Sequence, residues 1–165
     1  MVDGAGSPDG LEYAAALAAL YPVAYTLKFF SKLKLGRDYA VPPLQALWWA
    51  EDWSVFVRRD KSAWQWTTMI LLPEWLTAEH VEQARETVRS KKNPASLHRV
   101  RLETCDEGLS VQILHLGSYD SETETLRQLH EEHLPAHGLT ETDKHHEIYL
   151  NAPRKVAPEK LKTVL

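Results

Sequence analysis

The sequence predicts an α+β fold in which a β-α-β-β module occurs twice, with pseudo-twofold symmetry and a central aromatic cleft. In each half of the chain a strand ends at a glycine, Gly4 or Gly117, and a polar turn then opens a helix that is followed by strands. Most of the six tryptophans lie between residues 48 and 66. So many large aromatic side chains in one region need either a large core or a wide apolar pocket.

The composition is that of one soluble globular domain. The chain of 165 residues can bury a sizeable core, and its 44% hydrophobic and 25% charged content is ordinary. The net charge is −4 with no basic tail or stripe, which excludes nucleic acid as an expected partner. We expect a single domain over residues 1–165, with a first half of about 1–73, a connector of about 74–105 and a second half of about 106–165.

Cysteine usage and hydropathy indicate a cytoplasmic protein that does not use a membrane. Cys105 is the single cysteine, so an internal disulfide is excluded and a reducing compartment is expected. The N-terminus lacks the basic region of a signal peptide. The longest uncharged stretch, residues 13–27, is short for a membrane span and contains Pro22, so it is better explained as a buried helix.

The first half begins with a short strand at residues 1–3, and such an early strand suggests a piece of a longer protein. A helix of about 11–35 follows, because apolar residues recur at helical spacing. Pro22 should kink or split this helix, and Gly36 should end it. Strands are expected at 44–49 and 64–72, separated by a charged loop at 51–61.

The connector is expected to hold a helix that Thr77 caps and that ends near residue 92. Strands at 99–104 and 109–116 would then form a hairpin with Gly108 at the close of its turn.

The second half is expected to continue with a helix and two strands. Ser121 and Glu124 have the spacing of a capping box for the helix, in which Leu126, Leu129 and His133 would face inward. A strand is expected at 145–150. Residues 160–165 form either a last strand, which we favour, or a frayed helix.

The strand at 145–150 carries the most informative side chains. Alternate residues of a strand share a face, so Glu147 lies beside Tyr149 while Ile148 and Leu150 point to a core. A carboxylate beside a phenol in an apolar strand needs a positive or hydrogen-bonding partner. That partner is either a ligand or a nearby arginine or lysine of the chain.

The histidines do not form a metal-binding pattern. His145 and His146 are adjacent on a strand and point apart, so they cannot share an ion. His130 and His133 are one helical turn apart, but no third ligand accompanies them at metal spacing. No metal and no cofactor are expected.

Several segments together resemble the stand-alone GyrI-like small-molecule-binding proteins. The resemblance extends over essentially the whole chain, and the Leu-Trp-Trp run at 47–49 is specific in combination with His-His-Glu-Ile-Tyr-Leu at 145–150. The other similar segments are residues 25–29, 43–52, 64–67 and 157–163.

This resemblance implies a duplicated β-α-β-β fold with a central aromatic cleft. Relatives include effector domains of multidrug-responsive transcription activators, which bind bulky planar cations against an acidic residue, and stand-alone proteins that hydrolyse cyclopropane rings in DNA-alkylating natural products. It places the cleft glutamate at Glu147 and its neighbouring tyrosine at Tyr149. Gln45 stands where the family pattern leads us to expect a glutamate, which leaves Glu147 as the only expected cleft carboxylate.

Other residues are candidates for ligand contact. Trp49 and Trp66 could offer flat faces for stacking, and Tyr25 could reach the cleft from the first helix. Trp48 and Trp64 are better explained as core. The expected ligand-binding set is Glu147, Tyr149, Trp49, Gln45, Leu47, Trp66 and Tyr25; Glu147 and Tyr149 would be the catalytic residues of an enzyme.

Three functions fit the same acidic and aromatic residues. The first is polyspecific binding of bulky aromatic, often cationic compounds, which sequesters drugs or toxins in the cytosol. The second is a hydrolase that adds water to activated cyclopropanes. The third is a ligand-sensing subunit, which would need a separate DNA-binding partner because the chain has no helix-turn-helix of its own. We expect a monomer or weak homodimer whose partner is a hydrophobic aromatic or cationic small molecule.

Overall fold

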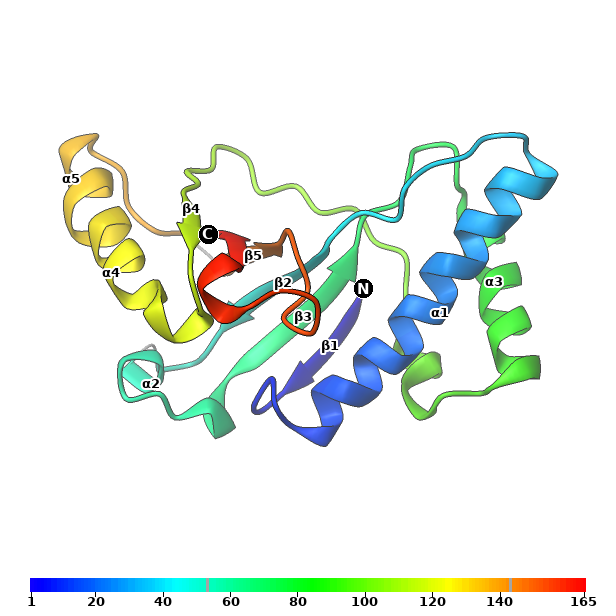
Figure 1. Cartoon of the computed structure of the whole chain (residues 1–165), viewed down its shortest axis with the longest axis horizontal. Coiled ribbons are helices and arrows are strands. Elements are labelled where there is room, and N and C mark those ends of the chain that lie inside the picture. The colour runs from blue at the N-terminus through cyan, green and yellow to red at the C-terminus, as the bar shows by residue number, and fades with distance from the viewer. Residues whose placement is uncertain (53, 143) are drawn as a thin grey trace. The chain divides into compact units, whose positions relative to one another are not determined.

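The computed structural model has an α+β architecture and describes residues 1–52, 54–142 and 144–165 (Figure 1). The strands are β1 (Val2–Ala5), β2 (Leu44–Trp49), β3 (Gln65–Ile70), β4 (Leu114–Leu116), β5 (His145–Tyr149) and β6 (Lys162–Val164). The α-helices are α1 (Leu11–Lys34), α2 (Ser54–Val57), α3 (Ala78–Lys91), α4 (Glu122–Arg127) and α5 (Leu134–Ala136), and the π-helix Gln128–His133 joins the last two.

The strands are hydrogen-bonded in the order β1-β3-β2-β5-β6-β4. The chain forms two compact units: unit 1 comprises residues 1–42 and 48–105, and unit 2 comprises residues 43–47 and 106–165. Counted inward from one edge, the strands are β1, β3 and β2; counted inward from the other edge, they are β4, β6 and β5. In each set the first strand lies at the edge, the last in chain order lies in the middle position, and the remaining strand lies innermost, as a duplicated module would place them. The duplication and its pseudo-twofold axis stay predictions.

Helix α1 is one continuous helix, so the expected division at Pro22 does not occur. Proline removes one backbone donor, but the buried face of the helix offsets this loss: Tyr13, Ala16, Ala19, Leu20, Val23, Ala24 and Leu27 are buried. Gly36 follows the helix with φ +67°, a conformation that favours glycine, as predicted for the end of the helix. By length and composition alone α1 could span a membrane, but it also has the contacts of a core helix, with α3 and with β1.

A buried hydroxyl ties the end of α1 to the segment before α3. The Ser31 hydroxyl is fully buried, donates to the Arg37 carbonyl at 2.5 Å and accepts from the Trp75 indole N–H at 3.0 Å. We expect Ser31→Ala to lower the free energy of unfolding by about 0.5–1.5 kcal/mol, because the half-buried Trp75 indole and the Arg37 carbonyl lose their partner. Urea unfolding measures this, with Ser90→Ala on the exposed surface of α3 as the control; equal stabilities for the two variants would refute it.

The Thr77 cap of α3 is confirmed. The Thr77 hydroxyl accepts from the His80 backbone N–H at 3.5 Å, and the His80 ring accepts from the Thr77 N–H at 3.2 Å. The expected charged loop at 51–61 contains α2, and its Trp53 lies outside the described residues.

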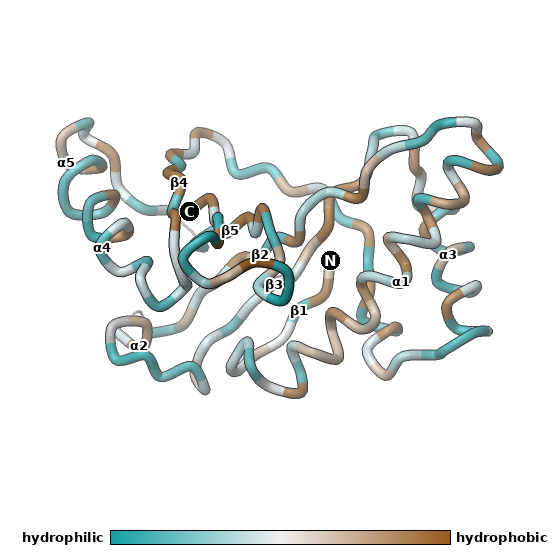
Figure 2. The backbone as a smooth tube through the Cα atoms, viewed as in Figure 1, coloured by the Kyte–Doolittle hydropathy of each residue, from teal (hydrophilic) through white to brown (hydrophobic). Residues whose placement is uncertain are grey.

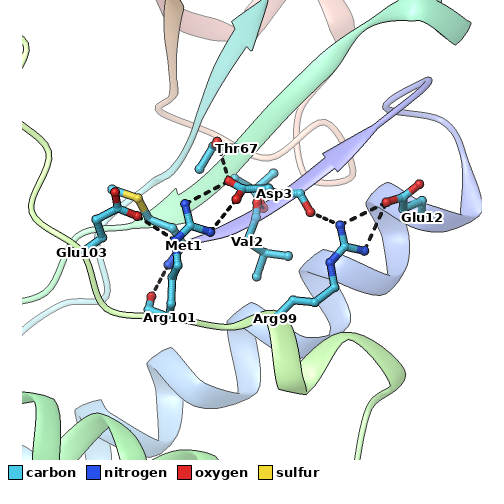
Figure 3. A network of polar contacts seen from close by, with 9 residues as sticks. Met1, Val2, Asp3, Glu12, Thr67, Arg99, Arg101 and Glu103 are labelled. Atoms are coloured by element: carbon cyan, nitrogen blue, oxygen red, sulfur yellow. Dashed lines mark hydrogen bonds and ion pairs between the residues drawn. The ribbon is translucent and has the colours of Figure 1, made fainter.

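Residues 99–104, predicted as a strand, run beside β1 without forming one (Figure 3). Arg101 is held there by polar contacts: its N–H donates to the Met1 carbonyl at 3.0 Å, and its guanidinium pairs with Asp3 at 2.8 Å and Glu103 at 2.6 Å. The Met1 amino group in turn donates to the Arg101 carbonyl at 2.7 Å. Side-chain ion pairs, rather than a strand ladder, fix this segment.

The predicted hairpin with residues 109–116 is therefore wrong. Of residues 99–116, only Leu114–Leu116 (β4) form a strand. This strand pairs antiparallel with β6 at the end of the chain, with His115 opposite Thr163. β6 also pairs antiparallel with β5, with Tyr149 opposite Thr163, which confirms the expected last strand. In unit 1, β1 pairs antiparallel with β3 in the register Val2 to Thr68.

The helical segment from α4 to α5 is mostly hydrophilic (Figure 2) and differs from its prediction in two ways. Ser121 makes no capping bond; its hydroxyl donates to the Ser118 carbonyl at 2.7 Å, while Glu124 pairs with Arg127. Leu129 is buried as expected, but His133 is exposed, because it belongs to the π-helix, whose residues are spaced differently around the axis from those of an α-helix.

Candidate functional site

The candidate site lies in unit 2, on the face of β5 that carries Glu147 and Tyr149. The Tyr149 hydroxyl donates to Glu147 Oε2 at 2.6 Å, so the predicted neighbourhood of the two side chains is confirmed. The Glu147 side chain is only 16% exposed. Ile148 is half-buried, but Leu150 is 45% exposed, so the expectation that Leu150 enters a core is wrong. The strand ends at Tyr149, and Leu150 is no longer constrained by its alternation.

His145 is the third side chain on this face. Its Nε2 lies 3.5 Å from Glu147 Oε1, and within the described part of the chain this nitrogen is buried without a hydrogen-bond partner. The His145 ring lies 6.4 Å from that of His130, which hydrogen-bonds Glu141 at 2.5 Å. His145 can therefore contribute a positive charge beside Glu147 when it is protonated.

Within the described residues, the polar partners of Glu147 are a phenol and an imidazole. Across residues 1–52, 54–142 and 144–165, no lysine or arginine forms an ion pair with it; its polar contacts are Tyr149 and His145. A mostly buried carboxylate normally has a cation or several donors around it. A cationic ligand could therefore supply the positive charge that the Glu147 carboxylate lacks.

A second carboxyl group belongs to this site. Glu122, the first residue of α4, is 7% exposed, and its Oε1 finds no hydrogen-bond partner among the residues that the structure describes. The pKa of Glu122 is raised to about 8, chiefly by burial and then by the charges of Glu147 and Asp120, against the opposing effect of the Thr163 hydroxyl. At neutral pH Glu122 is therefore mainly a neutral acid beside Glu147.

Glu122 corrects the expectation that Glu147 is the only carboxylate here. Sequence reasoning missed it because an acidic residue in the first turn of a helix is ordinary: it interacts favourably with the helix dipole. The spacing of Ser121 and Glu124 also predicted a structural role for Glu124 in this helix turn and none for Glu122. No local pattern shows that Glu122 is buried where the charge of Glu147 raises its pKa.

Gln45 contacts His146 rather than Glu147. Gln45 is 5% exposed, and its Oε1 lies 3.0 Å from His146 Nε2, while His146 Nδ1 lies 2.7 Å from Glu107. The two adjacent histidines thus point apart, as predicted. Gln45 connects β2 with β5 inside unit 2, and its amide has a satisfied structural role there.

The aromatic candidates belong to unit 1. Trp66 is fully buried, with its ring 5.0 Å from that of Tyr13, so it presents no exposed face for stacking. Trp48 is 4% exposed, which confirms its place in the core. Trp49 is half-buried, and Tyr25 is 48% exposed on α1.

Leu47, the last of the ligand-contact candidates, is half-buried and lies in the part of β2 that belongs to unit 2. Within the described residues, no three histidine, cysteine or acidic side chains gather closely enough to hold a metal ion. His130 and His133, the histidine pair one turn apart, have separate partners: Glu141 contacts the first, and the ring of His137 stacks on the second.

The arrangement combines a carboxylate, a phenol and a neutral carboxylic acid in one part of unit 2. A carboxylate can bind a cation or accept a proton, and a carboxylic acid or phenol can donate one. Two coupled carboxyl groups with different protonation are a common basis of acid–base chemistry.

Comparison with solved structures gives close relatives from Listeria innocua. An uncharacterized conserved protein is 40% identical with a TM-score of 0.90, and the match covers 99% of this chain and 83% of that one. Two structures of hydrolases are 38% and 40% identical, with TM-scores of 0.83 and 0.86; both matches cover 99% of this chain and 82% of the other. A search of curated proteins finds no significant match.

The model of the GyrI-like small molecule binding domain matches residues 31–165. Since this match covers most of the chain, the chain belongs to the GyrI-like small-molecule-binding family.

Proposed function

We propose that this protein binds bulky aromatic, often cationic small molecules in the cytosol and sequesters them. The observation that carries the proposal is Glu147: its carboxylate is largely buried, is held by Tyr149, and lacks a lysine or arginine partner among the described residues. An organic cation supplies the missing positive charge. Membership of a small-molecule-binding family agrees with this role.

Binding energy would come mainly from apolar contact. Micromolar affinity requires about 8 kcal/mol, whereas a cation over an aromatic face contributes about 0.5–2 kcal/mol. Burial of a large aromatic ligand must supply most of the remainder, and such burial discriminates weakly between compounds. Leu47, which is half-buried and belongs to the same unit as Glu147, is the side chain that we propose for these contacts.

Fluorescence titration with rhodamine 6G, a planar cation, tests this function. We expect saturable binding, with weaker binding of Nile red, an uncharged planar dye of similar size. If both dyes bind equally well, or if neither changes its fluorescence, the proposal fails.

A second candidate function is hydrolysis of activated cyclopropane rings. Two observations favour it: the pKa of the buried Glu122 is raised, in part by the charge of Glu147, and two similar structures are described as hydrolases. Glu147 would take a proton from water, whose oxygen forms a bond to a ring carbon as the ring carbon–carbon bond breaks. The released electron pair passes into a conjugated carbonyl, whose oxygen takes a proton from Tyr149 or Glu122.

We expect a product heavier than the substrate by one water when the protein is incubated with a cyclopropane-bearing alkylator, detected by mass spectrometry. Glu147→Ala should lower the rate by at least about 100-fold, because the base that activates water is lost. Product formation at the buffer rate by the wild-type protein would eliminate the hydrolase, while binding of the compound without turnover would agree with sequestration alone.

A further inference from the structure

The proposed binding of a cation by Glu147 does not by itself explain the buried carboxyl group of Glu122. We propose that Glu122 is the second charge-bearing group of the ligand site: it holds a proton in the empty site and releases it to solvent when an organic cation binds beside Glu147. The inference rests on the proposed binding function and adds that cation binding is coupled to the loss of one proton.

The surroundings of Glu122 keep it protonated. Its side chain is 7% exposed, and Oε1 is left without a hydrogen bond among the described residues, which disfavours a negative charge. The groups that act on it come from three elements: Glu147 of β5, Asp120 of the turn before α4, and the Thr163 hydroxyl of β6. Both acidic neighbours oppose its ionisation.

Two histidines, His115 and His145, have partners other than Glu122. On β4, His115 Nδ1 lies 2.8 Å from the Thr125 hydroxyl, and its Nε2 lies 3.1 Å from the Ser121 hydroxyl. His145 of β5 faces Glu147 at 3.5 Å. Of the two histidines, His145 is the one that faces Glu147, so the test has to separate its contribution from that of Glu122.

An arriving cation reverses this balance. Its positive charge offsets the repulsion that Glu147 exerts on Glu122 and attracts a second negative charge directly. The Glu122 O–H bond then breaks, its electron pair stays on the carboxylate, and the proton passes to water or buffer. An uncharged ligand offers no such attraction and leaves Glu122 protonated.

Proton release makes cation binding dependent on pH. Because the pKa of Glu122 in the empty site is about 8, the affinity for a cation should rise with pH and level off near that value. For one released proton the rise is at most about tenfold per pH unit. The same linkage predicts no rise for a neutral ligand.

Dissociation constants for rhodamine 6G and Nile red, measured by fluorescence between pH 6.5 and 8.5, test the inference. We expect wild-type affinity for rhodamine 6G to rise several-fold over this range while affinity for Nile red stays flat. Glu122→Gln should bind rhodamine 6G with a flat profile; Glu122→Leu serves the same purpose if the glutamine variant does not fold.

Two matched variants assign the titrating group. Glu124→Gln removes an exposed glutamate of the same helix and should keep the wild-type slope. His145→Asn should also keep it; a slope that disappears in His145→Asn and persists in Glu122→Gln would overturn the inference. So would rhodamine binding by wild type without any slope, although the proposed binding function would survive. Absence of all binding would overturn both.

Discussion

Glu147→Gln is expected to weaken the binding of rhodamine 6G by about 10- to 100-fold, the effect of losing about 1.4–2.7 kcal/mol. Glutamine keeps the shape of the side chain and can still accept a hydrogen bond from Tyr149. It removes the negative charge of Glu147. This charge is available to a ligand because no lysine or arginine pairs with it in the described part of the chain. Binding of Nile red should change little, because apolar contact dominates it.

Glu159→Gln is the control for this experiment, since Glu159 is an exposed glutamate whose removal changes the net charge of the protein equally. It should leave both dissociation constants unchanged. An equal loss of rhodamine binding in the two variants would indicate long-range attraction rather than a site at Glu147. Unchanged binding in Glu147→Gln would remove Glu147 from the ligand site.

Glu122→Gln is expected to gain stability relative to the wild type as the pH rises. The folded protein raises the pKa of Glu122 from its ordinary 4.5 to about 8, chiefly through burial. A group with a raised pKa contributes fully to folding below pH 4.5 and loses that contribution as the pH rises through about 8. Between pH 4 and pH 9 the wild type should lose about 3–5 kcal/mol relative to Glu122→Gln.

Chemical denaturation at several pH values measures this difference, and its change with pH is the test. A buried amide has its own desolvation cost, but this cost does not vary with pH. Glu124→Gln is the control: Arg127 lowers the pKa of Glu124, so this variant should gain no advantage at high pH. A constant difference between Glu122→Gln and the wild type would show that Glu122 is ionised in the folded protein.

Elements defined by local patterns were predictable from the sequence. The Thr77 cap, the end of α1 at Gly36 and the shared face of Glu147 and Tyr149 depend on residues only a few positions apart. For the same reason, His145 and His146 could be assigned to opposite faces of β5. Helix periodicity, glycine conformation and strand alternation act over such short distances.

Features set by distant contacts were not predictable in the same way. Residues 99–104 have the pattern of a strand, but Arg101 pairs with Asp3, and β4 pairs with β6 rather than with these residues. The raised pKa of Glu122 depends on Glu147, a residue on another element. Nothing in the sequence near Glu122 indicates that tertiary packing will bury it.

A crystal structure of the protein with bound rhodamine 6G tests the central claim most directly. The account predicts the charged end of the dye at ion-pair distance from the Glu147 carboxylate, with Tyr149 in contact. It would be contradicted by a dye seated only on the exposed apolar residues of α1, such as Phe29 and Leu33, or by a lysine or arginine of the chain folded onto Glu147.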